Sequence, residues 1–348
     1  FWGKLSDKYG RRPILIYCLL GEALSYLILA QSKSLEMLFV SRILTGFFGA
    51  SISTASAYVS DITTRENRTK GMAVIGAAFG LGFLFGPAIG GGLTLLAKQY
   101  STDQSFILTF AAYPVAALCF FTFIFAYFFL AESKERKQIG EEKDTRRQFH
   151  NIAEMFKKPV LGPLMLVFAF TTLSMAMMEA TLVLFMKDKF NWGITEASFG
   201  FAYVGICIVF TQGYMVRKLI PKFGEKSIIR AGLILMALGF ALIAIANSIW
   251  VMGTAMTFLS VGNAFTNPSV LGSISLITRA DQQGLTLGTT QSLSALGRVI
   301  GPALGTLLFG AISFSAPFWI GSLLLIMNVF VVMKYYAQLP ASNVKTAS

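Results

Sequence analysis

The sequence predicts an all-α membrane protein made of two related halves. Of its 348 residues, 55% are apolar and only 13% are charged, whereas a soluble domain carries about 25% charged residues. The apolar residues come in runs of about 20, the length that crosses a bilayer as an α-helix. A pattern of glycine and proline inside these runs occurs twice, 215 residues apart. Repeated halves of this kind are typical of membrane transporters.

The repeated pattern is first seen in the stretch from Gly82 to Gly90, where Gly82, Gly86 and Gly90 recur every four residues. On a helix they form a stripe without side chains, so we expect a neighbouring helix to pack closely there. Pro87 cannot donate to the carbonyl of Phe83, which predicts a bend. The corresponding residues of the second copy are Gly297, Gly301, Pro302 and Gly305.

The apolar runs predict ten membrane spans, interrupted by one long charged segment. Four spans come first, and they are Ile14–Ala30, Met37–Ser60, Gly71–Leu96 and Phe106–Leu130. Six follow, at Val160–Met186, Ala197–Val216, Ser227–Ala246, Ile249–Ile277, Leu285–Gly310 and Pro317–Val332. The predicted domains are therefore an N-terminal half at 1–130, a cytoplasmic linker at 131–159, a C-terminal half at 160–335 and a cytoplasmic tail at 336–348.

The basic residues predict the orientation of these spans. Of the 29 Lys and Arg, 23 lie in the loops, linker and termini of one side and four in the loops of the other. An excess of Lys and Arg marks cytoplasmic loops, so the linker and the tail are expected in the cytoplasm. This distribution also explains the net charge of +12 without nucleic acid as a partner.

The two halves differ in length. Two spans precede the basic loop Arg217–Lys226 of the second half, whereas only Phe1 and Trp2 precede the corresponding loop that begins at Gly3. If the duplication is complete, two helices are missing before Phe1. We therefore expect a twelve-helix protein whose first two helices are absent from this chain, which would hold helices three to twelve.

Four stretches of the first half resemble motifs of one transporter family. The loop Gly3–Pro13 (GKLSDKYGRRP) resembles the signature loop of the major facilitator superfamily at every position of that motif. The stretch from Gly82 to Gly91 resembles the fifth-helix motif of its proton-driven antiporters. Two more stretches are similar to the fourth-helix motif and to the tetracycline/proton antiporters, and these are Leu38…Arg42…Gly46…Ala50 and Ala57–Thr63. The resemblance implies a fold of two pseudo-symmetric six-helix bundles.

The resemblance also implies a cytoplasmic latch between the halves. Asp7 would cap the N-terminus of helix eleven, near Leu285–Gly288, where the helix dipole favours negative charge. Arg11 would pair with Asp61, and the two glycines of the same loop, Gly3 and Gly10, belong to the motif. The simpler interpretation is a solvated turn whose charges only set the orientation. In the second half the motif is degraded, because Gly224 matches Gly10 but Glu225 and Lys226 replace the two arginines.

Charged side chains inside the spans are candidates for substrate binding or proton coupling, because charge is costly in lipid. Glu22 and Glu179 are the acids placed deep in spans, and a carboxyl that exchanges a proton there can drive transport. Arg42 and Arg298 should face the interior or a partner, and Gln291 could line the same path. The simpler interpretations are hydrogen bonds between helices and, for Arg42, an arginine that reaches the interface.

These observations predict a secondary transporter rather than an enzyme. We expect proton-coupled antiport that exports a lipophilic or amphipathic drug-like solute by alternating access, in a monomer of a bacterial inner membrane. A uniporter or symporter of the same fold, importing a sugar, acid or nucleoside, is one alternative. A receptor or scaffold without transport activity is another. No cofactor and no metal ion are expected.

Overall fold

The computed structural model describes residues 1–133, 154–192, 194–279 and 282–335, and within them the regular structure is helical. The middle of the predicted linker and the whole predicted tail lie outside this part. Contacts divide the chain into two units, each described separately. Unit 1 holds Phe1–Ile62, Gly86–Gly140 and Ala280–Gly288, and unit 2 holds Thr63–Phe85, Glu141–Arg279 and Thr289–Ser348. Thus the start of α5 groups with second-half helices, and the start of α13 with first-half helices.

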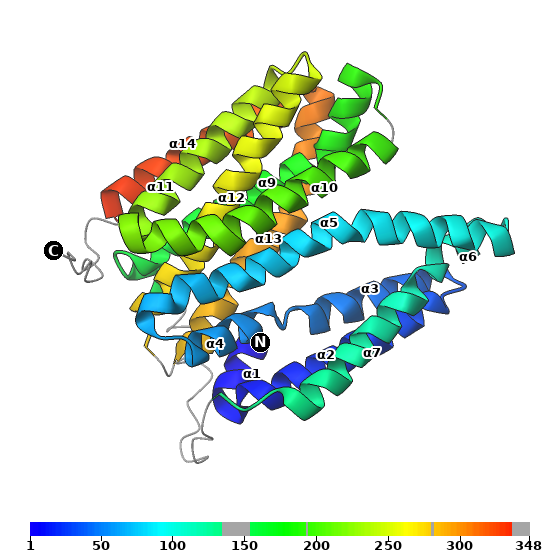
Figure 1. The fold of residues 1–348 in the computed structure, drawn as a ribbon, viewed down its shortest axis with the longest axis horizontal. Helices are drawn as coiled ribbons and strands as arrows, with labels where there is room; N and C mark the ends of the chain where they lie inside the picture. Colours follow the sequence, from blue (N-terminus) through cyan, green and yellow to red (C-terminus); the bar gives the residue numbers. More distant parts are fainter. Residues whose placement is uncertain (134–153, 193, 280–281, 336–348) are drawn as a thin grey trace. The chain divides into compact units, whose positions relative to one another are not determined.

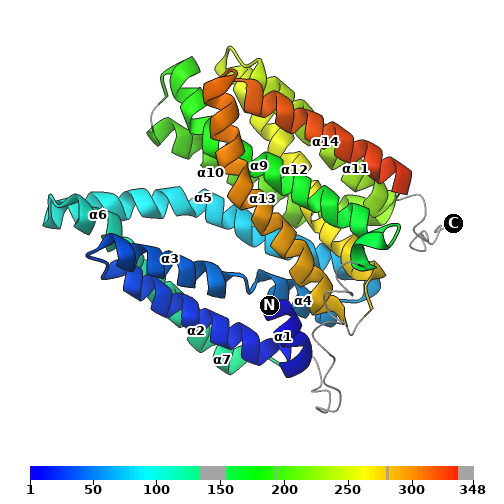
Figure 2. The same cartoon turned by 180° about the vertical axis from the view of Figure 1, so that it is seen from behind.

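Unit 1 is built on α2, which packs against α3 on one side and α7 on the other (Figures 1 and 2). Its helices are α1 (Trp2–Tyr9), α2 (Arg11–Ala30), α3 (Leu35–Gly49), α4 (Ile52–Ile62), α6 (Gln104–Phe110), α7 (Ala112–Phe129) and the second half of α5 (Arg68–Tyr100). Trp2, Ile14 and the thiol of Cys18 form a buried cluster that fixes α1 to α2. The loop that carries the family-like signature is therefore anchored on a membrane helix.

Unit 2 is centred on α11, which packs along α12 and α14 (Figure 1). Its helices are α9 (Leu161–Phe190), α10 (Ile194–Phe210), a π-helical turn η2 (Thr211–Met215), α11 (Val216–Ala244), α12 (Ile249–Ile277), most of α13 (Gln283–Ala311) and α14 (Ala316–Tyr335). A 3₁₀ turn, η1 (Arg65–Asn67), leads into α5. A buried cluster formed by Ala73, Val216, Ile220, Ile228 and Phe265 joins the start of α5 to α11 and α12.

Nine helical stretches in the described residues are long and apolar enough to cross a membrane. One of them, Phe199–Ala244, has 46 residues, the length of two crossings, and covers two of the predicted spans. Gly224 interrupts it with φ 73° and ψ 159°. Counted in this way, the stretches correspond to the ten predicted spans.

The span predicted over Met37–Ser60 lies within Leu35–Ile62, a stretch long and apolar enough to cross a membrane, but two helices form it. The structure ends α3 at Gly49 and begins α4 at Ile52. The indole of Trp2 donates to the carbonyl of Phe47 at 2.6 Å, and the amide of Ser51 donates to Phe48 three residues back at 3.2 Å. Both bonds use carbonyls that a continuing α-helix would need for its own ladder, so the helix breaks here.

Local structure also repeats between the halves, here with a spacing of 214 residues, one fewer than between the two glycine and proline patterns. Gly10 and Gly224 both have positive φ, at 100° and 73°, and similar ψ, at 160° and 159°. Ser34 caps α3 by accepting from the amide of Met37 at 3.3 Å, and Ser248, 214 positions later, caps α12 in the same way at 3.3 Å. The duplication therefore extends to the residues that begin and end helices.

The glycine stripe of the second copy packs closely against a neighbouring helix, as predicted, and the stripe of the first copy does not. On α13, an ideal Cβ at Gly297 or Gly301 would lie 3.1 Å from backbone atoms of α9, and at Gly305 it would lie 2.9 Å away. On α5, a Cβ at Gly82, Gly86 or Gly90 meets no described atom within 4 Å, so that expectation was wrong. The close contact of α5 lies earlier, where Gly76 meets Gln212, and Gly80 meets Ile208 and Gly205, because Gly76 faces η2 and Gly80 faces α10. The helix continues through Pro87, whose side chain is outside the described part.

Replacing Gly301 with Leu is expected to destabilise the second unit. An ideal Cβ at this position already lies 2.7 Å from the Cβ of Ala176, and overpacking of this kind costs about 1–3 kcal/mol. Thermal unfolding in detergent should show a lower midpoint for G301L. On the same helix, a Cβ at Gly310 meets no described atom within 4 Å, so G310L is the control. Equal midpoints for both variants would contradict close α9–α13 packing.

Candidate functional site

The turn between α1 and α2 is shaped around the carboxylate of Glu132. Its two oxygens accept from the backbone amides of Arg11 at 2.9 Å and Arg12 at 3.2 Å, the first free amides of α2. A negative group at a helix N-terminus satisfies unpaired donors and the dipole. Gly10 makes room for it, because a Cβ there would lie 2.5 Å from Oε2 of Glu132 in a backbone with positive φ. The lack of space for a Cβ thus explains why a glycine stands at position 10 of the motif.

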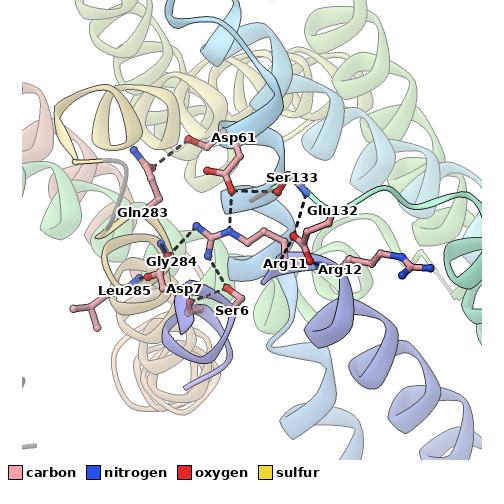
Figure 3. Close-up of polar contacts among 12 residues, drawn as sticks. Ser6, Asp7, Arg11, Arg12, Asp61, Glu132, Ser133, Gln283, Gly284 and Leu285 are labelled. Carbon is pink, nitrogen blue, oxygen red and sulfur yellow. Dashed lines mark hydrogen bonds and ion pairs between the residues drawn. The ribbon is translucent and has the colours of Figure 1, made fainter. Parts of the chain in front are cut away.

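Arg11 is the centre of the polar cluster that Figure 3 shows. Its side chain has no exposed surface, and it pairs with the carboxylate of Asp7 at 2.9 Å and with Asp61 at 2.9 Å. A third nitrogen donates to Oγ of Ser6 at 2.7 Å. A fully buried guanidinium is tolerated only with such partners. The predicted pair of Arg11 and Asp61 is present, and Asp7 is a second partner of the same guanidinium.

Asp7 connects this cluster to the start of α13. Its carboxylate accepts from the backbone amides of Gly284 at 3.1 Å and Leu285 at 2.8 Å, as Figure 3 shows. Gly3 permits this approach, because its α-carbon lies against the backbone of Gly284 where a Cβ would clash. The negative charge therefore lies at the positive end of a long helix. Asp7 bonds to Gly284 and Leu285, at the beginning of the predicted range.

Sequence analysis missed the neutral and acidic neighbours that complete the cluster. Ser60 donates to Oε1 of Gln283 at 3.2 Å, and Ser133 donates to Asp61 at 3.3 Å. Glu132 and Ser133 lie three and four residues after the end of the aromatic helix α7. That position, close to the end of a span, is the signal that could have revealed them. Nothing in the sequence pattern distinguishes Ser6 or Gln283 from other polar residues in loops and helix ends.

The structure brings Glu22 and Arg42 into one neighbourhood in unit 1. Glu22 is half-buried on α2, and its Oε1 would lie 3.0 Å from a Cβ at Gly49 on α3. Tyr26, one turn along α2, lies near Glu22, Arg42 and Cys119 of α7. The side chain of Arg42 is exposed. One acid and one phenol on α2 and one base on α3 are thus grouped on two packed helices.

A second group of charges lies along the α9–α13 contact in unit 2. Ser294 bonds to Thr172 at 3.1 Å across the two helices and accepts from Arg298 at 3.1 Å. Glu179 has a charge interaction with Arg298, and both side chains are exposed. Gln291 is half-buried on α13, one turn before Ser294. The sequence therefore identified the charged residues, whereas only the structure shows that Glu179 and Arg298 are neighbours.

These features define a class of protein. The apolar helices make it a multi-pass integral membrane protein, and intramembrane charges together with a helix-capping polar cluster are features of a transporter. In the described part of the chain no three His, Cys, Asp or Glu side chains gather in a way that could hold a metal ion. The chain belongs to the major facilitator superfamily, whose sequence profile matches residues 1–222 and 164–348.

Curated relatives extend this result. The class H tetracycline resistance protein of Pasteurella multocida is 32% identical over 95% of this chain and 80% of its own length. The class B protein of Escherichia coli is 31% identical over 92% of this chain and 76% of its own length. These bacterial relatives indicate the inner membrane as the location, as the sequence predicted.

A solved human relative is also similar. The crystal structure of the human organic anion transporter MFSD10 matches with 25% identity and a TM-score of 0.76, over 95% of this chain and 79% of that one. The proton:xylose symporter XylE matches with 14% identity and a TM-score of 0.73, over 96% of this chain and 82% of its own, which supports the fold alone. The chain is therefore a transporter of the major facilitator fold rather than an enzyme.

Proposed function

We propose that the protein is a proton-coupled antiporter that exports a lipophilic or amphipathic drug-like solute, and that it works as a monomer. The observation that supports it most is the buried Arg11, which joins Asp7 and Asp61 while Asp7 caps α13. Similarity to tetracycline resistance proteins over more than nine-tenths of the chain favours export of a drug-like solute. The two halves, 1–130 and 160–335, would alternate in access around a central path.

In this cycle the Asp7–Arg11–Asp61 cluster stabilises the state that is closed to the cytoplasm. The cluster fixes the loop between α1 and α2 to α13, so the two can separate only when the backbone bonds to Gly284 and Leu285 break. Gly3 and Gly10 allow the close contacts, and Glu132 orients the start of α2. Breaking the latch is therefore the step that opens the cytoplasmic side.

Glu22 and Glu179 are the proposed proton-binding groups, and Arg42, Arg298 and Gln291 the proposed contacts for the solute. Antiport requires that a proton and the solute favour different states or compete for one site. A carboxylate beside a guanidinium meets this requirement, because protonation of Glu179 changes the charge that Arg298 and a bound solute experience. Gly301 and Pro302 shape the α13 backbone beside this pair, and we assign Gly82, Gly86, Pro87 and Gly90 to the corresponding part of α5.

A transport screen in proteoliposomes tests this proposal. An inwardly acid pH gradient should drive uptake of cationic and zwitterionic amphipathic drugs, and a protonophore should abolish it. Proton release on addition of solute, in the absence of a gradient, would support coupling directly. Flux that is insensitive to the protonophore would indicate a uniporter and contradict the proposal. Absence of any flux would instead favour the receptor or scaffold alternative.

A second substrate class is worth including in the same screen. The relative of known structure is described as an organic anion transporter, and the exposed guanidinium groups of Arg42 and Arg298 suit an anionic group. Uptake of organic anions together with protons would identify a symporter of the same fold, as in the alternative considered above. The direction of proton movement distinguishes the two functions.

A further inference from the structure

A second set of polar contacts surrounds the start of α5, within unit 2. The guanidinium of Arg68 donates to Oγ of Ser275 at 2.9 Å and to the carbonyl of Thr63 at 3.2 Å. Arg65 donates to the carbonyl of Leu276 at 3.3 Å, in the last turn of α12. The hydroxyl of Thr69 donates to the carboxylate of Glu225 at 3.1 Å. The backbones are close as well, since a Cβ at Gly272 would lie 3.0 Å from the α-carbon of Thr69.

These contacts repeat the geometry of the first cluster. Ser275 lies 215 positions after Ser60, and Gln283 lies 215 positions after Arg68. Both pairs are bonded, Ser60 with Gln283 at 3.2 Å and Ser275 with Arg68 at 2.9 Å. In each copy, the last turn of one helix (α4 or α12) is fastened to the first turn of another (α13 or α5). The duplication has therefore preserved a contact as well as a fold.

The charges have exchanged places between the two copies. The loop that carries the buried Arg11 in the first half carries Glu225 at the corresponding position, directly after the matched glycine Gly224. The guanidinium stands instead on the docking helix, where Arg68 replaces the neutral Gln283. Arg65 adds a positive charge at the C-terminal end of α12, where the helix dipole favours it. Different residues thus join the corresponding helix ends in the two copies.

We propose that Arg68 and Glu225 form a second cytoplasmic latch, which holds the start of α5 to α11 and α12 and opens more easily than the latch around Arg11. Arg11 is fully buried and bridges two carboxylates, whereas Arg65 is exposed, and Arg68 and Glu225 are half-buried. Breaking a buried ion pair leaves an uncompensated charge and is costly. Partly exposed groups regain water when they separate, and salt screens them. The contacts of this second latch do not depend on the proposed function. Only the role of its opening in transport rests on the proposed transport cycle.

Two cysteine reporters can measure the latches separately. Thr69 and Ser60 are each 1% exposed, so T69C and S60C, made in a protein without Cys18, Cys119 and Cys207, should react slowly with an impermeant thiol reagent. The two substitutions remove the Thr69–Glu225 and Ser60–Gln283 bonds, so the reporters measure how well the contacts of Arg68 and of Arg11 keep each place closed. Inside-out vesicles present the cytoplasmic face to the reagent. We expect R68Q to raise the labelling rate of T69C by about tenfold, the effect of losing one charge-assisted hydrogen bond, and to leave S60C within about twofold of the parent.

Salt and a matched arginine complete the test without further substitutions in the latch. Raising NaCl from about 0.1 M to about 1 M shortens the screening length from roughly 10 Å to 3 Å, so T69C should react faster and S60C should not. Arg217 is an exposed arginine on the neighbouring helix α11, and R217Q should change neither rate. Monodisperse elution of each variant shows that it is folded.

Two results would overturn the second latch. One is an unchanged T69C rate in both R68Q and high salt, and the other is an equal rise at T69C and S60C, which would mean that the two places open as one. Labelling needs neither solute nor a proton gradient, so it stays informative if the protein transports nothing in the screen. Conversely, proton-driven export together with an equal rise in the labelling rates of T69C and S60C would support the proposed function and reject this inference.

Discussion

Replacing Asp7 with Asn should reduce transport by about tenfold or more while membrane insertion stays intact. The carboxylate pairs with Arg11 and accepts two amides of α13, and its side chain is 14% exposed. Removing one member of a buried pair costs about 3–5 kcal/mol. With partial exposure and one acceptor retained in Asn, about 2 kcal/mol is expected, enough to depopulate the closed state about 30-fold.

The measurement is solute flux in proteoliposomes, normalised to the amount of protein inserted. D188N is the matched control, because Asp188 is an exposed acid in the last turn of α9, on the opposite side of the membrane by the charge distribution. It makes the same chemical change outside the cluster. Transport by D7N at the rate of D188N would mean that the cluster has no role in gating.

Replacing Glu179 with Gln is expected to uncouple transport from protons. Glutamine keeps the shape and the hydrogen-bonding atoms of the side chain but cannot exchange a proton, and it removes the charge beside Arg298. A transporter whose proton site is neutral in both states receives no bias from the gradient. Accumulation against a gradient should therefore fall to equilibration, at least about tenfold, while exchange of labelled for unlabelled solute continues.

Substrate-induced proton release is the second readout, and it should disappear in E179Q. The same experiment on E22Q shows which of the two acids carries the proton. E66Q is the control, because Glu66 is exposed in the η1 turn and lies outside both charge groups. Proton release at the parental level in both E179Q and E22Q would assign the coupling proton to another part of the protein.

The latch was expected only from the family resemblance, which linked Asp7 to the start of α13 and Arg11 to Asp61. Asp7 and Arg11 are four residues apart, on one side of a short turn, and a glycine with positive φ separates the two helices that carry them. Their pairing was not predicted, because the rule that side chains four residues apart meet holds within one helix. Asp61 and the start of α13 are distant in sequence, and only the family resemblance linked them to this loop.

Glu132 and the α5 contacts were missed because their partners are distant in sequence. Glu132 reaches Arg11 across 121 positions, and Arg68 reaches Ser275 across 207 positions, so no periodicity records either pair. The glycine stripe of α5 failed as a prediction because every glycine on a helix looks alike in sequence. The face of α5 that meets α10 and η2 is marked by Gly76 and Gly80, whose partners lie more than 120 positions away.

The sequence by itself determined that this chain is a helical membrane protein and that one plan is used twice. Hydropathy and spacing are one-dimensional properties that lipid and topology act on directly, and the charges of the loops predict an orientation for the same reason. The tertiary structure decided which carboxylates surround Arg11, which acid has Arg298 as a neighbour and where the helices touch. Those outcomes depend on packing between residues far apart in the chain, where a side chain is satisfied only by whatever the fold brings to it.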